Sequence, residues 1–129
     1  MKRVYIIDDS KQIRERLIDL LADYPTVQVV GQSASAQEAV APLDTLRPDI
    51  LVLDVCLPGK SGIEFLHDAK IRWPDMLVFI MTNYDYPEYR RQSERAGADR
   101  FFNKTKDFEA LIAALKKNDT EGYKPKSGE

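Results

Sequence analysis

The chain of 129 residues holds one cysteine, one histidine and no excess of charge of either sign. A single cysteine excludes an internal disulfide framework and fits a reducing compartment. The 19 basic and 21 acidic side chains give a net charge of −2, and this balance shows neither a basic nucleic-acid footprint nor an acidic tail. We therefore expect no nucleic-acid partner within this chain.

Long hydrophobic runs are also missing. No apolar stretch approaches the roughly 20 residues that a membrane-spanning helix needs. The basic start, residues 1–3, is followed by only the short apolar run 4–7, which is too short for a secretory signal peptide. These absences predict a cytoplasmic protein with no membrane contact. The length predicts one domain, residues 1–118, and the polar segment 119–129 is expected to be a flexible tail.

Short apolar runs alternate with helical patterns five times along the chain. The runs at 4–7, 27–30, 50–53, 76–81 and 100–102 are typical of buried strands. Repeated strand–helix units predict an α/β fold, in which a doubly wound parallel sheet carries helices on both faces.

Turn and cap residues mark the intervening helices. Ser35 and Glu38 form a capping box, and Gly97 supplies a left-handed helix end. Pro42 interrupts the apolar stripe of the second helix, which predicts a kink or a short helix there. Thr105 is interpreted as the N-cap of the last helix.

Polar side chains follow four of the predicted strands, at the point where each strand ends. Asp8 and Asp9 follow the first strand, Asp54 the third, Thr82 the fourth and Lys104 the fifth. The carboxyl ends of parallel strands meet at one edge of a sheet, so these side chains should converge. Three converging carboxylates repel one another unless a cation lies among them, and oxygen ligands of this kind suit Mg²⁺. The pattern predicts metal-assisted chemistry on a phosphoryl group.

With these residues in place, the sequence resembles the receiver domains of two-component response regulators, of the kind found in chemotaxis regulators. The resemblance spans residues 1 to about 117. It is carried by Asp8-Asp9, by Asp54 with Pro58 and Gly59, and by Gly62, Thr82 and Lys104. It implies a flavodoxin-like five-stranded sheet with strand order 2-1-3-4-5. It also implies that Asp54 accepts a phosphoryl group from a histidine kinase or a histidine phosphotransfer protein, as a switch rather than a turnover enzyme.

The same resemblance implies a role for each site residue. Mg²⁺ would be held by Asp8, Asp9, Asp54 and the backbone carbonyl of Cys56, although one of the Asp8-Asp9 pair could serve mainly to cap a helix. Thr82 and Lys104 would contact phosphoryl oxygens. Thr82 and Phe101 would form the conformational switch, while Phe102 should point to the opposite face of its strand.

Three further features carry weaker hypotheses. The face formed by the fourth helix, the fifth strand and the fifth helix is a candidate surface for an output partner or a dimer. Its candidate residues are Tyr86, Tyr89, Arg90, Arg91 and Arg95. Asn83 and Tyr84 should crowd the phosphoryl site and slow its hydrolysis. Thr105, where many receivers have proline, is reminiscent of receivers joined to helix-turn-helix output domains.

Other functions would require different residues at these positions. A phosphatase of the haloacid-dehalogenase type would need its nucleophile after the first strand and a second acid where this chain has Cys56. A flavin-binding electron carrier would need a hydroxyl-rich loop in place of residues 8–11. His67 as a phosphohistidine carrier and Cys56 as a redox centre are less favoured than a solvated helix residue and a structural thiol.

Overall fold

The computed structural model of the protein describes residues 1–55, 62–83 and 86–117. Strands and helices alternate along these residues, as the apolar pattern predicts. The elements are β1 (Lys2–Ile7), α1 (Lys11–Leu21), β2 (Val27–Ser33), α2 (Ala36–Leu46), β3 (Ile50–Leu53), α3 (Gly62–Arg72), β4 (Leu77–Thr82), α4 (Pro87–Ala96), β5 (Arg100–Asn103) and α5 (Phe108–Lys116).

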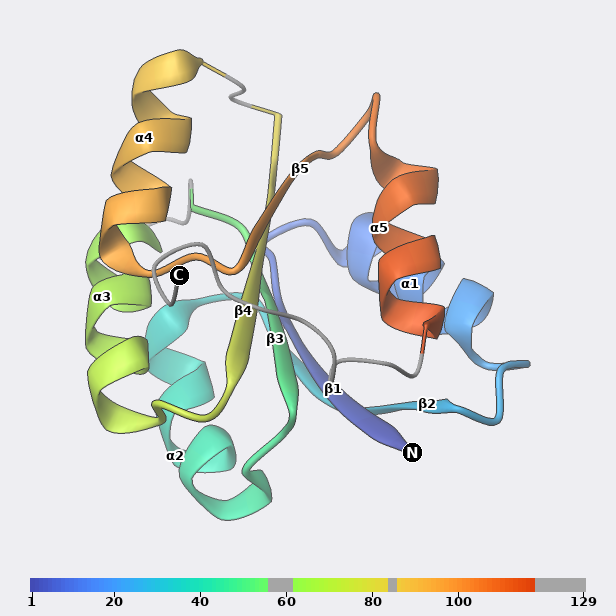
Figure 1. Ribbon diagram of the computed structural model, residues 1–129. Helices are drawn as coiled ribbons and strands as arrows, with labels where there is room; N and C mark the ends of the chain where they lie inside the picture. Colours follow the sequence, from blue (N-terminus) through green and yellow to red (C-terminus); the bar gives the residue numbers. More distant parts are fainter. Residues whose placement is uncertain (56–61, 84–85, 118–129) are drawn as a thin grey trace.

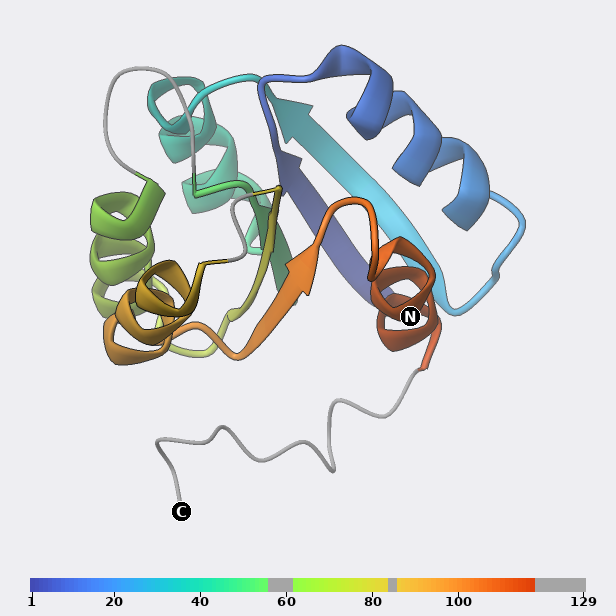
Figure 2. The same cartoon turned by 90° about the horizontal axis from the view of Figure 1, so that it is seen from above.

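The strands form one parallel sheet in the order β2-β1-β3-β4-β5. Helices α1 and α5 cover one face, and α2, α3 and α4 cover the other (Figures 1 and 2). The doubly wound, flavodoxin-like sheet expected from the sequence is therefore confirmed. Ile7 pairs with Leu53, and Leu53 pairs with Ile80, so the carboxyl ends of β1 and β3 lie level with one another, while β4 continues beyond them to Thr82.

Two hydrophobic cores lie on opposite sides of the sheet. Tyr5, Leu53 and Ile80 contribute to the core beneath α2 and α3, whereas Ile6 and Val52 contribute to the core beneath α1 and α5. Such alternation follows from the two-residue period of a strand. It also separates two neighbours on β5, because Phe101 packs against the first core and Phe102 is buried in the second. The opposite orientation predicted for these two rings is confirmed.

Several predicted helix ends are confirmed. Ser35 Oγ accepts a hydrogen bond from the N–H of Glu38 at 3.3 Å and so caps α2 as predicted; it also donates to the Glu38 carboxylate at 3.0 Å, a side-chain bond in place of the backbone bond that completes a capping box. Gly97 ends α4 with a φ of 108°, a conformation that favours glycine because a side chain would be strained there. Among the described helices, none is long and apolar enough to cross a bilayer.

Two local predictions need correction. α2 continues through Pro42 to Leu46, so the helix does not stop at the proline, and the kink remains a prediction; the buried residues Ala36, Ala39 and Leu43 lie on both sides of Pro42 in the sequence. Thr105 does not cap the last helix, because α5 begins only at Phe108.

The side chain of Asn103 explains the late start of α5. Its Oδ1 accepts hydrogen bonds from the N–H groups of Thr105 and Lys106 at 2.8 and 2.9 Å. These bonds fold residues 103–106 into a turn before the helix begins.

Candidate functional site

The carboxyl edge of the sheet gathers the polar residues that follow the strands. The N–H of Asp54 donates to the carbonyl of Ile7 at 3.0 Å, and the N–H of Lys104 donates to the carbonyl of Thr82 at 2.9 Å. These backbone bonds continue the strand pairing by one residue beyond β3 and β5. The side chains of four separate segments are thereby fixed at one edge.

The start of α3 is tied to the end of β3 next to Asp54. The N–H of Gly62 donates to the carbonyl of Val55 at 3.0 Å. A Cβ on Gly62 would overlap the main chain of Val55, so the close approach requires glycine.

The three acids form one cluster. Asp8, Asp9 and Asp54 each offer a carboxylate oxygen, and these oxygens lie within 4.8 Å of one another. Asp8 and Asp54 are buried, whereas Asp9 is exposed at the mouth of the cluster. The convergence predicted from the strand ends is present in the fold.

Lys104 reaches into the cluster and touches both buried acids. Its Nζ donates a hydrogen bond to Asp54 Oδ2 at 2.8 Å and lies 2.7 Å from Asp8 Oδ2. Burial disfavours the ammonium, yet the attraction of the Asp54 and Asp8 carboxylates outweighs this and raises the Lys104 pKa. Burial raises the pKa of Asp8 despite the opposing effects of Lys104 and of the Ser10 N–H.

The Lys104 contact with Asp8 is an ion pair whose direction does not meet hydrogen-bond geometry. Asp8 Oδ2 is therefore buried without a hydrogen bond among the described residues. Three carboxylates face one ammonium, so a divalent cation would neutralise the cluster. A buried oxygen without a directed donor, within an all-oxygen set of acids, fits a hard cation such as Mg²⁺.

The turn that carries Asp8 is held from three sides. The N–H of Asp8 donates to the carbonyl of Ser33 at 3.1 Å, and the N–H of Ser10 donates to Asp8 Oδ1 at 2.8 Å. The guanidinium of Arg14 donates to the backbone carbonyl of Asp8 and, at 2.7 Å, to Gln32 Oε1. Sequence reasoning missed Arg14 and Gln32, because their contact joins α1 to the end of β2 and leaves no local pattern.

The two residues predicted to form a switch lie at the ends of β4 and β5. Thr82 is fully buried at the last position of β4. The Phe101 ring is half-buried, and the Arg90 guanidinium of α4 lies over it, 4.4 Å from the ring centroid. Arg90 therefore differs from Arg91 and Arg95 of the same helix, which are exposed.

Other predicted residues lie at or beyond the margin of the site. Asn83 is exposed, and its Oδ1 accepts a hydrogen bond from Thr105 Oγ1 at 3.2 Å. His67 is exposed on α3 beside Asp68, which agrees with the solvated helix residue that was predicted. Cys56 and Tyr84, with the roles predicted for them, lie outside the described residues.

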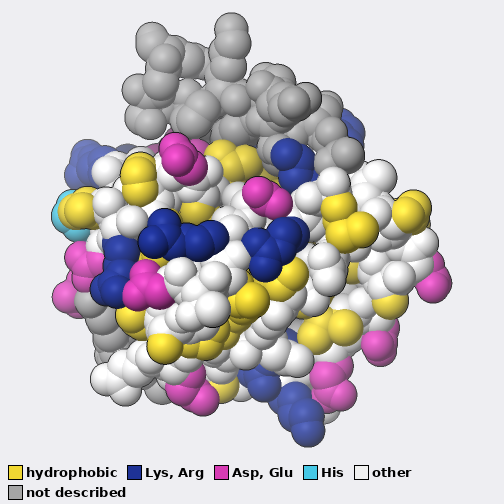
Figure 3. Space-filling view, turned by 90° about the horizontal axis from the view of Figure 1, so that it is seen from below, with side chains coloured by type: hydrophobic (Ala, Val, Ile, Leu, Met, Phe, Trp, Pro, Cys, Tyr) yellow, Lys and Arg dark blue, Asp and Glu magenta, His cyan; other side chains and the backbone are white. Residues whose placement is uncertain are grey.

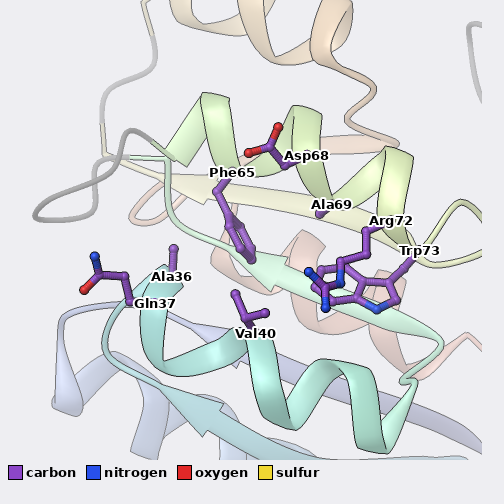
Figure 4. Close-up of a pocket in the computed structure, with 8 residues that line it drawn as sticks. All are labelled: Ala36, Gln37, Val40, Phe65, Asp68, Ala69, Arg72 and Trp73. Atoms are coloured by element: carbon purple, nitrogen blue, oxygen red, sulfur yellow. The ribbon is translucent and has the colours of Figure 1, made fainter.

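One hollow lies apart from the carboxylate cluster. A groove of about 330 Å³ between α2 and α3 is lined by Val40, Phe65 and Trp73 (Figure 4). Two residues of its lining, Arg72 and Trp73, donate hydrogen bonds to the carboxylate of Asp44. Figure 3 shows the molecule from the end opposite to the carboxylate cluster. On this face, basic and acidic side chains are interspersed.

Comparison with known sequences identifies the architecture. The family model of the response regulator receiver domain matches residues 4–116. The chain belongs to this family. The receiver domain is 38% identical over 116 residues to the DNA-binding transcriptional activator DevR/DosR of Mycobacterium tuberculosis, covering 90% of this chain and 54% of that protein. The chain thus spans about half the length of the curated relatives it matches first.

Solved receiver structures share the fold. A LuxR-family response regulator from Aurantimonas sp. SI85-9A1 is 28% identical, with a TM-score of 0.77 and coverage of 88% of this chain and 86% of that chain. The response regulator domain of Thermotoga maritima CheB is 26% identical, with a TM-score of 0.78 and coverage of 89% and 90%. Membership of this family, with Asp54 placed after β3 rather than β1, disfavours the phosphatase alternative.

Proposed function

We propose that this receiver domain accepts a phosphoryl group on Asp54 from a histidine kinase or a histidine phosphotransfer protein. The observation that carries the proposal is the cluster itself, in which Asp54 lies beside two further carboxylates and is hydrogen-bonded to Lys104. An Asp54 oxygen would form the new bond to phosphorus while the bond from phosphorus to the imidazole nitrogen breaks, leaving its electron pair on nitrogen.

The other side chains would stabilise the charge on the transferred group. Asp8, Asp9 and Asp54 would hold Mg²⁺, together with the Cys56 carbonyl assigned by resemblance. When bound, the ion supplies positive charge to the phosphoryl oxygens. Lys104 supplies a second positive charge from the neighbouring strand, and Thr82 has its hydroxyl within the same edge of the sheet.

We infer that the output is a change of conformation rather than a released product. Movement of Thr82 toward the phosphoryl group would open space for the Phe101 ring, which now lies beneath Arg90. Rotation of that ring would change the surface formed by α4, β5 and α5. Tyr86, Tyr89, Arg90, Arg91 and Arg95 are the proposed partner residues there, for an output protein or a second copy of the chain.

The wider protein and the domain boundary are also proposals. The Mycobacterium relative is named as a DNA-binding transcriptional activator. Its name favours a transcriptional output, carried by a partner or by sequence outside these 129 residues. We place the end of the domain at residue 118, close to the end of the family match at residue 116.

Intact mass after incubation with acetyl phosphate and Mg²⁺ tests the phosphoacceptor. The wild type should gain the mass of one phosphoryl group, and Asp54→Ala should not gain it. His67→Ala serves as the matched control and should be phosphorylated like the wild type, because His67 is exposed on α3 away from the cluster. A wild type whose mass never changes, or a modification that maps to His67, would overturn the proposal.

A further inference from the structure

Arg14 holds the peptide that joins the first two acids of the site. This half-buried arginine of α1 donates from Nη1 to the backbone carbonyl of Asp8, which belongs to the peptide bond leading into Asp9. Its Nε donates to Gln32 Oε1 at 2.7 Å, at the end of β2. One guanidinium therefore fixes this peptide relative to both a helix and a strand.

The acid that follows this peptide has no side-chain support of its own. The Asp8 carboxylate is held by the Ser10 N–H and by Lys104. By contrast, within residues 1–55, 62–83 and 86–117 no hydrogen bond or ion pair engages the exposed carboxylate of Asp9. The direction of the Asp9 side chain consequently depends on the main chain that Arg14 holds.

We propose that Arg14 is a positioning residue for the metal site. It fixes the plane of the Asp8–Asp9 peptide, so that the Asp9 carboxylate stays within reach of Asp8 and Asp54. The inference rests on the proposed function, because it concerns the Mg²⁺ that the three acids would hold. Outer contacts that orient ligands typically change metal affinity about tenfold or more when they are removed.

The charge of Arg14 and its positioning role predict opposite changes in Mg²⁺ affinity when the side chain is removed. A guanidinium beside a cation site repels the ion, so on charge alone its removal should tighten Mg²⁺ binding. If Arg14 acts by positioning, its removal should weaken binding. The sign of the change therefore separates the two effects.

Calorimetric titration of the whole chain with MgCl₂ provides the test. Arg14→Gln should bind Mg²⁺ about tenfold more weakly than the wild type. Lys11→Gln is the charge-matched control, since Lys11 is exposed on the first turn of the same helix and contacts no described residue through a hydrogen bond or ion pair. Its affinity should be unchanged or slightly tighter. Arg14→Lys keeps the charge but not the two-pronged donor geometry, and it should also bind more weakly.

The outcomes are distinguishable. Unchanged Mg²⁺ affinity in Arg14→Gln, whatever its thermal stability, would overturn the positioning role, and so would tighter binding. If Arg14→Gln does not fold, Gln32→Ala removes only the bond that orients the guanidinium, and equal affinity in that variant would overturn the role instead. At saturating Mg²⁺, phosphorylation of Asp54 by acetyl phosphate should recover in Arg14→Gln. A wild type that binds no Mg²⁺ would overturn the proposed function rather than this inference alone.

Discussion

Asp8 shows how a single residue of this site opposes the stability of the fold. Its carboxylate is fully buried, faces two further acids and has one oxygen without a hydrogen bond among the described residues. Removal of a carboxylate from water disfavours its charged form, and neighbouring negative charges add to that effect. The residue is thus better suited to binding a cation than to stabilising the cation-free protein.

Asp8→Asn should stabilise the protein in EDTA. The amide keeps the oxygen that accepts from the Ser10 N–H but removes the buried charge. We expect a gain of about 1 kcal/mol in the free energy of unfolding at pH 7, measured by urea denaturation. Because the folded-state pKa of Asp8 is raised, the wild type should lose stability relative to the variant as the pH rises above about 4. Parallel stability curves from pH 4 to 8 would contradict this prediction.

Among the elements, α4 is the one held by the fewest buried side chains. Ser93 is its single buried residue, and the Ser93 hydroxyl has no hydrogen-bond partner among the described residues. The Arg90 guanidinium lies over Phe101, so part of the contact between α4 and the sheet is made by a charged side chain. Such a helix can change position at a small energetic cost, which suits the switch proposed for this face.

Ser93→Ala should stabilise α4 because it removes a buried hydroxyl that lacks a partner. We expect a gain of about 1–2 kcal/mol in unfolding free energy and slower amide hydrogen exchange within α4. Gln92→Ala is the control for helix propensity, since Gln92 is exposed on the same helix and its replacement should contribute less than about 0.5 kcal/mol. Equal gains for the two variants would show that the buried hydroxyl has no such effect.

For single helices and strands, the sequence predicts the features that depend on neighbouring residues alone. The two-residue period of a strand correctly predicts that Phe101 and Phe102 lie on opposite faces of the sheet. The end of α4 was also predictable, because glycine is the residue that most readily adopts the positive φ found at Gly97, 108°. β2 runs three residues beyond the predicted run because its polar end, through Ser33, pairs with β1. That extension depends on a partner strand and has no apolar signal of its own.

For the whole molecule, metal binding and folding are linked. A ligand that binds only the folded state stabilises it by about 2.7 kcal/mol at a concentration 100 times its dissociation constant. Added Mg²⁺ should therefore raise the thermal midpoint of the wild type. Asp9→Asn removes one carboxylate charge from the exposed side of the cluster, and its midpoint should respond much less to Mg²⁺. Equal responses of the two proteins would count against the assignment of the pocket.

The sequence predicts which side chains meet at the site, because each of them follows a strand. It does not predict the contacts that these side chains make. Parallel topology alone brings Asp8, Asp54 and Lys104 to one edge. The bond from Arg14 to the Asp8 carbonyl and the stacking of Arg90 on Phe101 join segments that are packed together only after folding. Neither contact follows from spacing along the chain, because each depends on how a helix sits against the sheet.

The close contact between Gly62 and Val55 has a consequence for how homologous chains can vary. Val55 and Gly62, the residues that flank 56–61, are joined by a backbone hydrogen bond. The distance between these two residues is therefore set by that bond and does not depend on the length of the intervening segment. In a saturation library selected for folded protein, position 62 should return glycine almost alone, because every other side chain would collide with the main chain of Val55. Insertions and deletions within 56–61 should be tolerated far better by the fold, since they leave the end of β3 and Asp54 in place.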